Sequence, residues 1–383
     1  MRTTDRVPAS RQGRTIGTLV AAFALLLITA PPASATLKTV PDDTWMANGS
    51  VYAIARAGNR IYLGGSFTQV REEAGSGAVV ARDRLAAFDA TTGEVVSTWN
   101  PGANATVYAL AVSPDGTRVY AGGDFTTVGG QSRVRLAAID AITGGVVPGW
   151  DPSVDGRVRG LAASASRVYV GGGFLNVDGQ YRKKLAAVDP VTGALDGAWI
   201  PKANKTVRAV ALSPDGGRVY ISGYFEKVSG VARAHIAAVS PTTGAVDPNW
   251  HPNPGYGIWA LAVSSTRVYG AGGGSGGKLP AFSVASGSTL WTKNTDGDVQ
   301  AVALLGDRVY AGGHFFSMAG QSRQHLAAVD AVSGALDPNW KATANSKWGV
   351  WATLAYADKL YIGGDFTEVS GVAQLRFAQF SEV

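Results

Sequence analysis

Apolar residues occur in short runs that are separated by turn residues along most of the chain. In one representative stretch the predicted strands are residues 107–112, 118–125 and 136–140, divided by turns such as Ser113-Pro-Asp-Gly116. Short apolar runs between Pro, Asp and Gly clusters are typical of buried β-strands. Pro presets φ and Gly accepts positive φ, so each cluster predicts a turn. The pattern predicts many short antiparallel strands.

These strands form a unit that recurs seven times. Its signature is Val-Tyr-Ala-Gly-Gly-x-Phe, then Leu-Ala-Ala-x-Asp-x-x-Thr-Gly, then Trp. The Tyr of the unit is Tyr62, Tyr120, Tyr169, Tyr220, Tyr269, Tyr310 and Tyr361. A repeat of about fifty residues indicates modules that bury their apolar faces only against their neighbours. Four predicted strands per unit, repeated radially, give an all-β, seven-bladed β-propeller.

The two ends of the chain suggest how this ring closes. The last unit, residues 350–383, has only three predicted strands, while Asp42-Asp-Thr-Trp45 matches the segment that ends the other units. We therefore expect an N-terminal strand to complete the last blade and leave no unpaired edge between the first and last blades.

Specific repeat residues resemble known families. Gly122-Gly-Asp-Phe125, Gly364-Asp-Phe-Thr367 and Leu326-Ala-Ala-Val-Asp330 resemble the delta-60 repeat of secreted bacterial propellers. Residues 185–193, followed by Trp199, also resemble the repeats of quinoprotein propellers. The resemblance covers almost all of the chain after residue 35 and implies the propeller fold. It carries over no catalytic residues, since propellers host many unrelated activities.

The N-terminus is typical of an export signal. Four arginines precede an apolar stretch, residues 16–30, and the small-x-small pattern of residues 31–35. We predict a signal peptide at residues 1–35, a single propeller domain at residues 36–383, and secretion. The apolar stretch is shorter than the roughly 20 residues of a membrane-spanning helix, so no span is expected after cleavage. The chain has no Cys, so packing alone must stabilise the domain.

Most of the conspicuous residues are predicted to be structural because they recur once per blade. The recurring tryptophans are Trp45, Trp99, Trp150, Trp199, Trp250, Trp291 and Trp340. A large aromatic residue at one fixed position in each unit is most simply a packing anchor. The Asp residues before the hairpin turns, such as Asp140 and Asp189, are expected to bond nearby backbone N–H groups.

Two positions vary within this constant frame and are the candidate binding residues. The second residue of each innermost strand is Tyr52, Tyr108, Arg159, Arg208, Trp259, Gln300 or Trp351. The residue between Gly-Gly and Phe is Ser66, Asp124, Gly173, Tyr224, Gly273, His314 or Asp365. Both positions are expected at the same mouth of the central channel. Aromatic faces with guanidinium and carboxylate groups suit a sugar or small polar ligand.

We therefore predict a non-catalytic protein that binds a carbohydrate or cell-surface polymer at this mouth. One alternative is that these side chains only fill the channel. Another is a protein-interaction scaffold that uses a basic rim on the loops between the second and third strands. The predicted rim residues are Arg71, Arg82, Arg84, Arg133, Arg135, Arg182, Lys183, Lys184, Arg233, Arg323 and His325. A third is a polysaccharide lyase or hydrolase that uses His314 with Asp365.

Other classes of function lack support in the sequence. The net charge is +6, but charged residues make up only 16% and do not form the dense basic clusters of nucleic-acid-binding proteins. The four His residues show no metal-ligand spacing, and without Cys a zinc site has little support. We therefore expect no nucleic-acid partner, metal or cofactor.

Overall fold

The computed structural model describes residue 1 and residues 36–72, 77–274, 276–346 and 348–383. The predicted signal peptide therefore lies outside the described residues except for Met1. All of the strands belong to one compact unit, residues 34–383. None of the described residues forms a helix, so none of them forms a helix suited to crossing a membrane.

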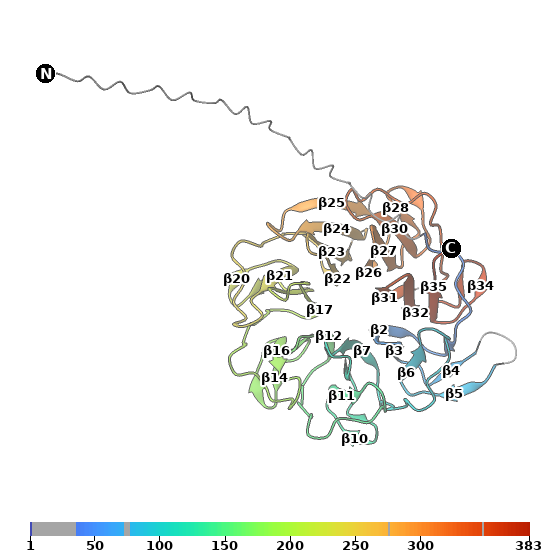
Figure 1. Cartoon of the computed structure of the whole chain (residues 1–383), viewed down its shortest axis with the longest axis horizontal. Helices are drawn as coiled ribbons and strands as arrows, with labels where there is room; N and C mark the ends of the chain where they lie inside the picture. The colour runs from blue at the N-terminus through green and yellow to red at the C-terminus, as the bar shows by residue number, and fades with distance from the viewer. Residues whose placement is uncertain (2–35, 73–76, 275, 347) are drawn as a thin grey trace. The chain divides into compact units, whose positions relative to one another are not determined.

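Antiparallel sheets succeed one another along the chain, each built from an innermost, a middle and a third strand. The three-stranded sheets are β2 (Val51–Ala57), β3 (Arg60–Gly65) and β6 (Leu85–Asp89); β7 (Val107–Val112), β8 (Arg118–Gly123) and β11 (Leu136–Asp140); β12 (Val158–Ala163), β13 (Val168–Gly172) and β16 (Leu185–Val188); β17 (Val207–Leu212), β18 (Val219–Gly223) and β21 (Ile236–Val239); β26 (Val299–Leu305), β27 (Arg308–Gly313) and β30 (Leu326–Asp330); and β31 (Val350–Tyr356), β32 (Lys359–Gly364) and β35 (Phe377–Phe380). A four-stranded sheet contains β22 (Ile258–Val263), β23 (Arg267–Gly272), β24 (Lys278–Ser283) and β25 (Thr289–Asn294). Their innermost strands surround a common centre (Figure 1). The fold is a β-propeller, as predicted.

The Gly-Gly pair at the end of the middle strands permits close packing. A Cβ on Gly123 would lie 2.1 Å from the carbonyl oxygen of Thr106 in the same sheet. A Cβ on Gly122 would lie 2.4 Å from Val158 Cγ1 in the next sheet. Neither position has room for a larger residue, so these glycines allow the backbones of adjacent sheets to approach.

The expectation of four strands in every blade was wrong. Among the described residues only β25 is a regular fourth strand, whereas the corresponding segments elsewhere pair through single bridges such as Ile139–Val146 and Val188–Leu195. These segments turn after the bridge, as the bond from the Trp150 N–H to the Val147 carbonyl shows. The turn places the recurring Trp in the core between two sheets.

The loops between the second and third strands are also more ordered than predicted, because most of them form hairpins. These hairpins are β4 (Gln69–Arg71) with β5 (Val79–Ala81), β9 (Thr127–Val128) with β10 (Gln131–Ser132), β14 (Asn176–Val177) with β15 (Gln180–Tyr181), β19 (Lys227–Val228) with β20 (Val231–Ala232), β28 (Ser317–Met318) with β29 (Gln321–Ser322), and β33 (Glu368–Val369) with β34 (Val372–Ala373). A short strand, β1 (Met46–Ala47), pairs with β4. In the sheet β22–β25, β23 leads to β24 with no such hairpin among the described residues.

The recurring Trp and Tyr link each sheet to the next. Trp99 packs edge-on against Tyr62, with ring centroids 5.0 Å apart. The Trp99 indole donates to the Asp140 carbonyl at 3.0 Å, and the Tyr62 hydroxyl donates to the Ala141 carbonyl at 2.7 Å. Both acceptors lie at the turn of the following sheet. The indole-to-carbonyl bond recurs for Trp150, Trp199, Trp250, Trp291 and Trp340, which confirms their predicted structural role, whereas the Tyr220 and Tyr361 hydroxyls have no hydrogen-bond partner among the described residues.

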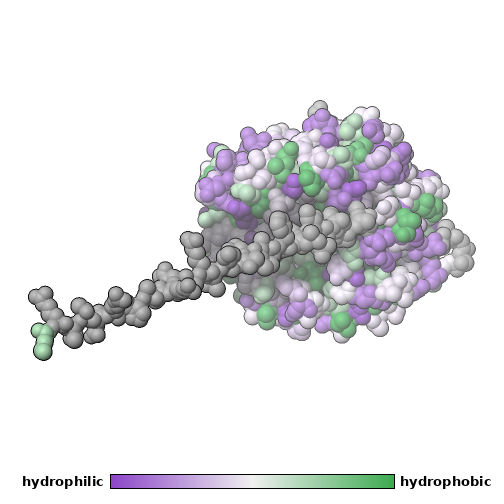
Figure 2. Space-filling model, turned by 45° about the horizontal axis from the view of Figure 1, so that its top comes forward, coloured by the Kyte–Doolittle hydropathy of each residue, from purple (hydrophilic) through white to green (hydrophobic). Residues whose placement is uncertain are grey.

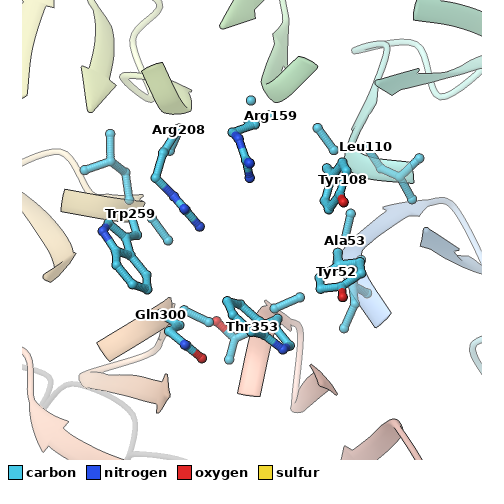
Figure 3. Close-up of a pocket in the computed structure, with 18 of the residues that line it drawn as sticks. Tyr52, Ala53, Tyr108, Leu110, Arg159, Arg208, Trp259, Gln300 and Thr353 are labelled. Carbon is cyan, nitrogen blue, oxygen red and sulfur yellow. The ribbon is translucent and has the colours of Figure 1, made fainter. Parts of the chain in front are cut away.

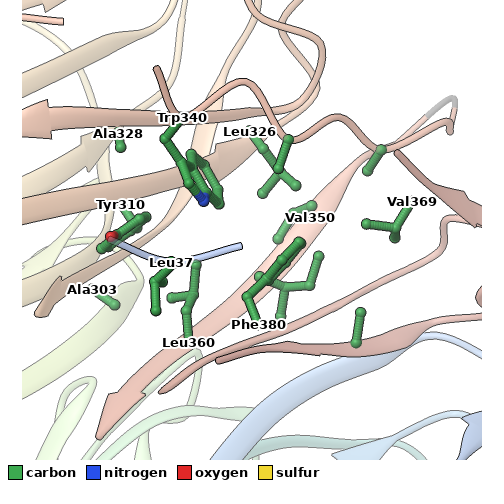
Figure 4. Close-up of a cluster of buried hydrophobic side chains, with 14 of the residues drawn as sticks. Leu37, Ala303, Tyr310, Leu326, Ala328, Trp340, Val350, Leu360, Val369 and Phe380 are labelled. Atoms are coloured by element: carbon green, nitrogen blue, oxygen red, sulfur yellow. The ribbon is translucent and has the colours of Figure 1, made fainter. Parts of the chain in front are cut away.

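The N-terminal segment lies beside the C-terminal strand. Asp42 bridges to Gln379 of β35, and Leu37 bridges to Glu382. The Trp340 indole donates to the Lys38 carbonyl at 3.1 Å. In the other sheets the equivalent indole donates to a carbonyl of the next sheet, as Trp99 does to Asp140. Leu37, Tyr310, Trp340 and Phe380 share one buried cluster (Figure 4). The segment pairs with β35 and the residues after it through isolated bridges, and not as the regular strand that was predicted.

The outer surface is mixed in character. On the face seen in Figure 2, hydrophobic residues are scattered singly among hydrophilic ones. Several of the most exposed, Ile142, Val191 and Val332, follow the Asp or Pro that begins a hairpin turn. Isolated exposed apolar residues of this kind are normal on soluble proteins and do not mark a binding face.

Candidate functional site

A cavity of about 490 Å³ occupies the centre of the propeller. It is lined by the second residue of every innermost strand, and by the two residues that follow each of them (Figure 3). The variable lining residues are Tyr52, Tyr108, Arg159, Arg208, Trp259, Gln300 and Trp351. The prediction that these side chains meet around the channel is therefore correct, whereas binding by them stays a prediction.

A β-bulge places each of these side chains in the channel. The pairing between β7 and β8 shifts register between Val107 and Ala109, which leaves Tyr108 as the extra residue. The pairing between β12 and β13 shifts between Val158 and Gly160, around Arg159. The other innermost strands have the same shift at the equivalent residue. Bulges redirect side chains, and here they allow the variable residue to change without disturbing the ladder on either side.

Aromatic side chains form one wall of the channel. The Tyr52 ring centroid lies 5.2 Å from that of Tyr108 and 5.8 Å from that of Trp351. All three side chains are half-buried, so their rings are supported by neighbours and still reach the cavity. Ring surfaces that are held in this way provide stacking platforms for a flat or ring-shaped ligand.

Two guanidinium groups form the opposite wall. The Arg159 guanidinium lies 5.4 Å from the Tyr108 ring centroid, and that of Arg208 lies 4.5 Å from the Trp259 ring centroid. No ion pair joins either arginine to a carboxylate of the described chain. Burial lowers the pKa of both groups, and the positive charges of Arg208 and Arg157 lower the pKa of Arg159 further.

The second variable position contributes less to the channel than predicted. Asp124 is paired with Arg157, whose Nε donates to Oδ1 at 2.8 Å. Tyr224 packs edge-on against Trp259, with ring centroids 6.4 Å apart, beside the channel. None of the residues at this position, from Ser66 to Asp365, lines the channel cavity itself.

Tyr224 and Trp259 share a second pocket of about 660 Å³ with Tyr256, Lys278 and Asp298. It lies at the sheet β22–β25, where the usual hairpin is missing. The indole N–H of Trp259 is buried and has no hydrogen-bond acceptor among the described residues. The absent hairpin therefore leaves an open depression next to the channel.

Asp298 is a site residue that the sequence interpretation missed, because it belongs to neither of the two variable positions. Its Oδ1 accepts the Gly274 N–H at 2.7 Å, and its Oδ2 lies 3.8 Å from His314 Nδ1. A signal was available, since this carboxylate directly precedes the innermost strand β26. Arg157 was missed although it occupies the same position before β12.

The proposed catalytic pair, His314 with Asp365, is not formed in the described structure. His314 faces Asp298, and 3.3 Å separates its Nδ1 from the side-chain amide of Gln300. Asp365 accepts a hydrogen bond from the Ser346 hydroxyl. No hydrogen bond or ion pair joins the two among the residues described. Asp298 directly precedes β26, whereas Ser346 lies in the segment before β31, so His314 and Asp365 have different partners.

The prediction of an exposed basic rim is wrong for four of its arginines. Arg82, Arg133, Arg182 and Arg323 are buried, with exposed fractions of 3–7%. Arg133 donates to the Ser132 carbonyl at 2.7 Å and to the Val147 carbonyl at 3.1 Å, so it joins a hairpin to the fourth segment. An arginine recurs at this position in five of the sheets, as Arg82, Arg133, Arg182, Arg233 and Arg323, and that recurrence was the signal that these residues are structural.

The next basic position of the rim is also structural. Arg84, Arg135 and Lys184 have left-handed backbone conformations, with φ between 63° and 70°. Arg135 donates to the Val154 carbonyl at 2.8 Å, and Lys184 donates to the Gly173 carbonyl at 2.8 Å. His325 occupies the equivalent position and is almost fully buried. In the described part of the chain, no group of three or more His, Asp or Glu residues is arranged to hold a metal ion.

Comparisons with known proteins agree with the fold. The model of a family described as outer membrane protein assembly factor BamB matches residues 135–362. The chain is similar to the crystal structure of the WD40 β-propeller domain of Doa1, with a TM-score of 0.58 and 13% identity over 89% of this chain and 96% of that chain. It is also similar to the computationally designed Ika8 protein, with a TM-score of 0.53 and 15% identity over 91% of this chain and 100% of that chain. These identities show the fold alone. A comparison with curated proteins gave no match.

Proposed function

The chain belongs to the family described as outer membrane protein assembly factor BamB, and from that premise we propose that it is a secreted, non-catalytic propeller that binds a carbohydrate or cell-surface polymer in its channel. One observation carries the proposal: at one position of the innermost strands the residue varies from sheet to sheet, and all seven residues at this position line the 490 Å³ cavity. The repeat frame provides stability, so variation at the channel position points to recognition.

The proposed architecture is a seven-bladed ring of delta-60 repeats, closed at the N-terminal segment and exported through the signal peptide of residues 1–35. The packing of β2 against both β7 and β31 supports closure. The hydrogen bond from Trp340 to the Lys38 carbonyl supports it from the outer side.

The chemistry of the lining supports a sugar-like ligand. Tyr52, Tyr108 and Trp351 offer ring faces for stacking, and Arg159 and Arg208 offer N–H donors for hydroxyl or acidic oxygens. A half-polar cavity of this size suits a ligand of one or a few sugar rings better than an extended apolar molecule.

The test is binding of the secreted protein to immobilised polysaccharides and cell-wall polymers. We expect Trp351→Ala to weaken binding about tenfold, because it removes a stacking face. Tyr356→Ala is the matched control: it lies on the same strand, β31, is 49% exposed and does not line the cavity. No binding to any polymer, or equal losses in both variants, would contradict the proposal. Polymer turnover that His314→Ala abolishes would favour the lyase or hydrolase alternative.

A protein-interaction scaffold is the second candidate, and the family description, which names an assembly factor, favours it. The buried arginines of the predicted rim leave the channel mouth as the surface to test. Crosslinking of the secreted protein to a cell-envelope protein, lost in Trp351→Ala while polysaccharide binding is absent throughout, would favour this function over the first.

A further inference from the structure

We propose that Arg159 and Arg208 form an anion site in the channel that binds a carboxylate, sulfate or phosphate group of the ligand. This inference rests on the proposed function, because the acidic group would be part of the carbohydrate or polymer proposed above. The site itself is defined by the two guanidinium groups and their surroundings.

The two arginines come from neighbouring innermost strands. Arg159 lies on β12 and Arg208 on β17, and these strands pack against each other. Both side chains extend toward the middle of the channel (Figure 3). The equivalent bulges, which direct each residue inward, therefore place two positive charges side by side.

Their lack of an ion-pair partner among the described residues separates them from three half-buried arginines of the outer sheets. Arg167 pairs with Asp196 at 2.6 Å, Arg218 with Asp247 at 2.9 Å, and Arg308 with Asp337 at 3.1 Å. No Asp or Glu occurs among the residues that line the channel cavity. Two like charges that are partly removed from water repel each other and lose hydration, so a bound anion would stabilise the pair. The lowered pKa of each group is consistent with that cost.

Aromatic rings hold the two guanidinium groups in place, and the Tyr224 hydroxyl also interacts with Arg208. Arg159 lies over the Tyr108 ring and Arg208 over the Trp259 ring. Stacking on an aromatic face uses the plane of a guanidinium and leaves its N–H groups free at the edge. A planar guanidinium can donate two parallel N–H bonds to two oxygens of one carboxylate, sulfate or phosphate group. The cavity is larger than such a group, so a sugar ring could extend from it toward Tyr52 and Trp351.

Sulfate, an oligomer of a hexuronic acid and the matching neutral oligosaccharide are the three probes. At constant ionic strength set with chloride, we expect sulfate and the acidic oligomer to raise the melting temperature saturably. Isothermal titration should show affinity for the acidic oligomer about tenfold lower in Arg159→Gln or Arg208→Gln and about a hundredfold lower in the double variant. Arg208→Lys, which keeps the charge but loses the fork, should fall between wild type and Arg208→Gln.

Arg56→Gln is the matched control. Arg56 also stacks on a ring, 3.6 Å from the centroid of Tyr356, but it does not line the cavity. Its substitution should leave the binding of all three probes unchanged. The unfolding midpoint of each variant without ligand separates a loss of binding from a loss of folding.

The outcomes distinguish this inference from the proposed function. Neutral and acidic oligomers that bind equally, and independently of both arginines, would overturn the anion site and leave carbohydrate binding standing. Arginine-dependent binding of sulfate with no binding of either oligomer would support the anion site and overturn the proposed function. No binding of any probe would overturn both.

Discussion

Trp199 and Trp351 show how differently the outer sheets and the channel use the same kind of side chain. Trp199 is fully buried, packs against Tyr169 and donates its indole N–H to the Ser240 carbonyl of the next sheet. Trp351 is half-buried beside Tyr52 and faces the cavity. The neighbouring repeat accepts the hydrogen bond of Trp199, whereas the Trp351 ring keeps a face toward the cavity. A repeated position therefore supports the frame, and a varied one is available for a ligand.

The largest expected effect is on the repeated side of this comparison. Trp199→Ala removes a buried ring and leaves the Ser240 carbonyl without its donor, so we expect a loss of about 3–5 kcal/mol in the free energy of unfolding. Trp351→Ala should cost less than about 1 kcal/mol, because its ring is half exposed. Chemical denaturation of both variants is the measurement. Equal losses would remove the distinction between frame and channel.

Arginines give the second test. Arg133→Met leaves the carbonyls of Ser132 and Val147 without their charged donor, so we expect a loss of about 2 kcal/mol. Arg159→Met should be neutral or slightly stabilising without ligand, because it removes a charge that has no counter-charge and is repelled by Arg208. Denaturation at low salt is the measurement. A clear loss in Arg159→Met would show that the channel arginine also supports the fold.

The smallest expected effect concerns the turn acids of the outer sheets. Hydrogen bonds from the backbone N–H groups of Thr143 and Ile142 lower the pKa of Asp140. A carboxyl whose pKa is lower in the folded state stabilises the fold above its unfolded pKa, near 4, and this contribution is lost as pH falls through the folded value. Asp140→Asn should therefore lose less stability than wild type between pH 5 and pH 2.

Asp189 makes the matching bonds with Thr192 and Val191, so Asp189→Asn should behave alike. The measurement is the free energy of unfolding at several pH values across that range. If the free energy of unfolding fell as steeply with decreasing pH in either variant as in wild type, these turn carboxylates would contribute nothing to the stability of the frame.

The sequence was sufficient for the frame because the repeat reports each structural position several times. Apolar runs located the three inner strands of each sheet, and the recurring Trp and Tyr were recognised as anchors. The fourth strand was overestimated, because a segment such as residues 146–150 has strand-like residues but turns after one bridge. That turn depends on the core position of Trp150 in the next sheet, which local sequence does not specify.

The candidate site was predicted in part, for a related reason. The channel position was found because its residue varies within a constant frame, but nothing in the sequence revealed the bulge that directs Tyr108 or Arg159 inward. The arginines of the supposed rim seemed exposed because they lie in polar loops. Their carbonyl partners, such as Val147 for Arg133, lie well along the chain and become neighbours only through the fold. Asp298 was missed because its partner, His314, follows the end of β27 and becomes its neighbour only through the fold.

The pairing of the first and last described residues of the propeller has a topological consequence. Val383 donates its N–H to the Thr36 carbonyl at 2.9 Å, so these two residues are already neighbours. A short peptide could join them and turn the propeller into a covalent circle, which could then be reopened at the exposed Ser229-Gly230 turn of another blade. Such a circular permutant would keep nearly every contact around the channel. The order of the blades in the chain is thus separable from the channel that they surround.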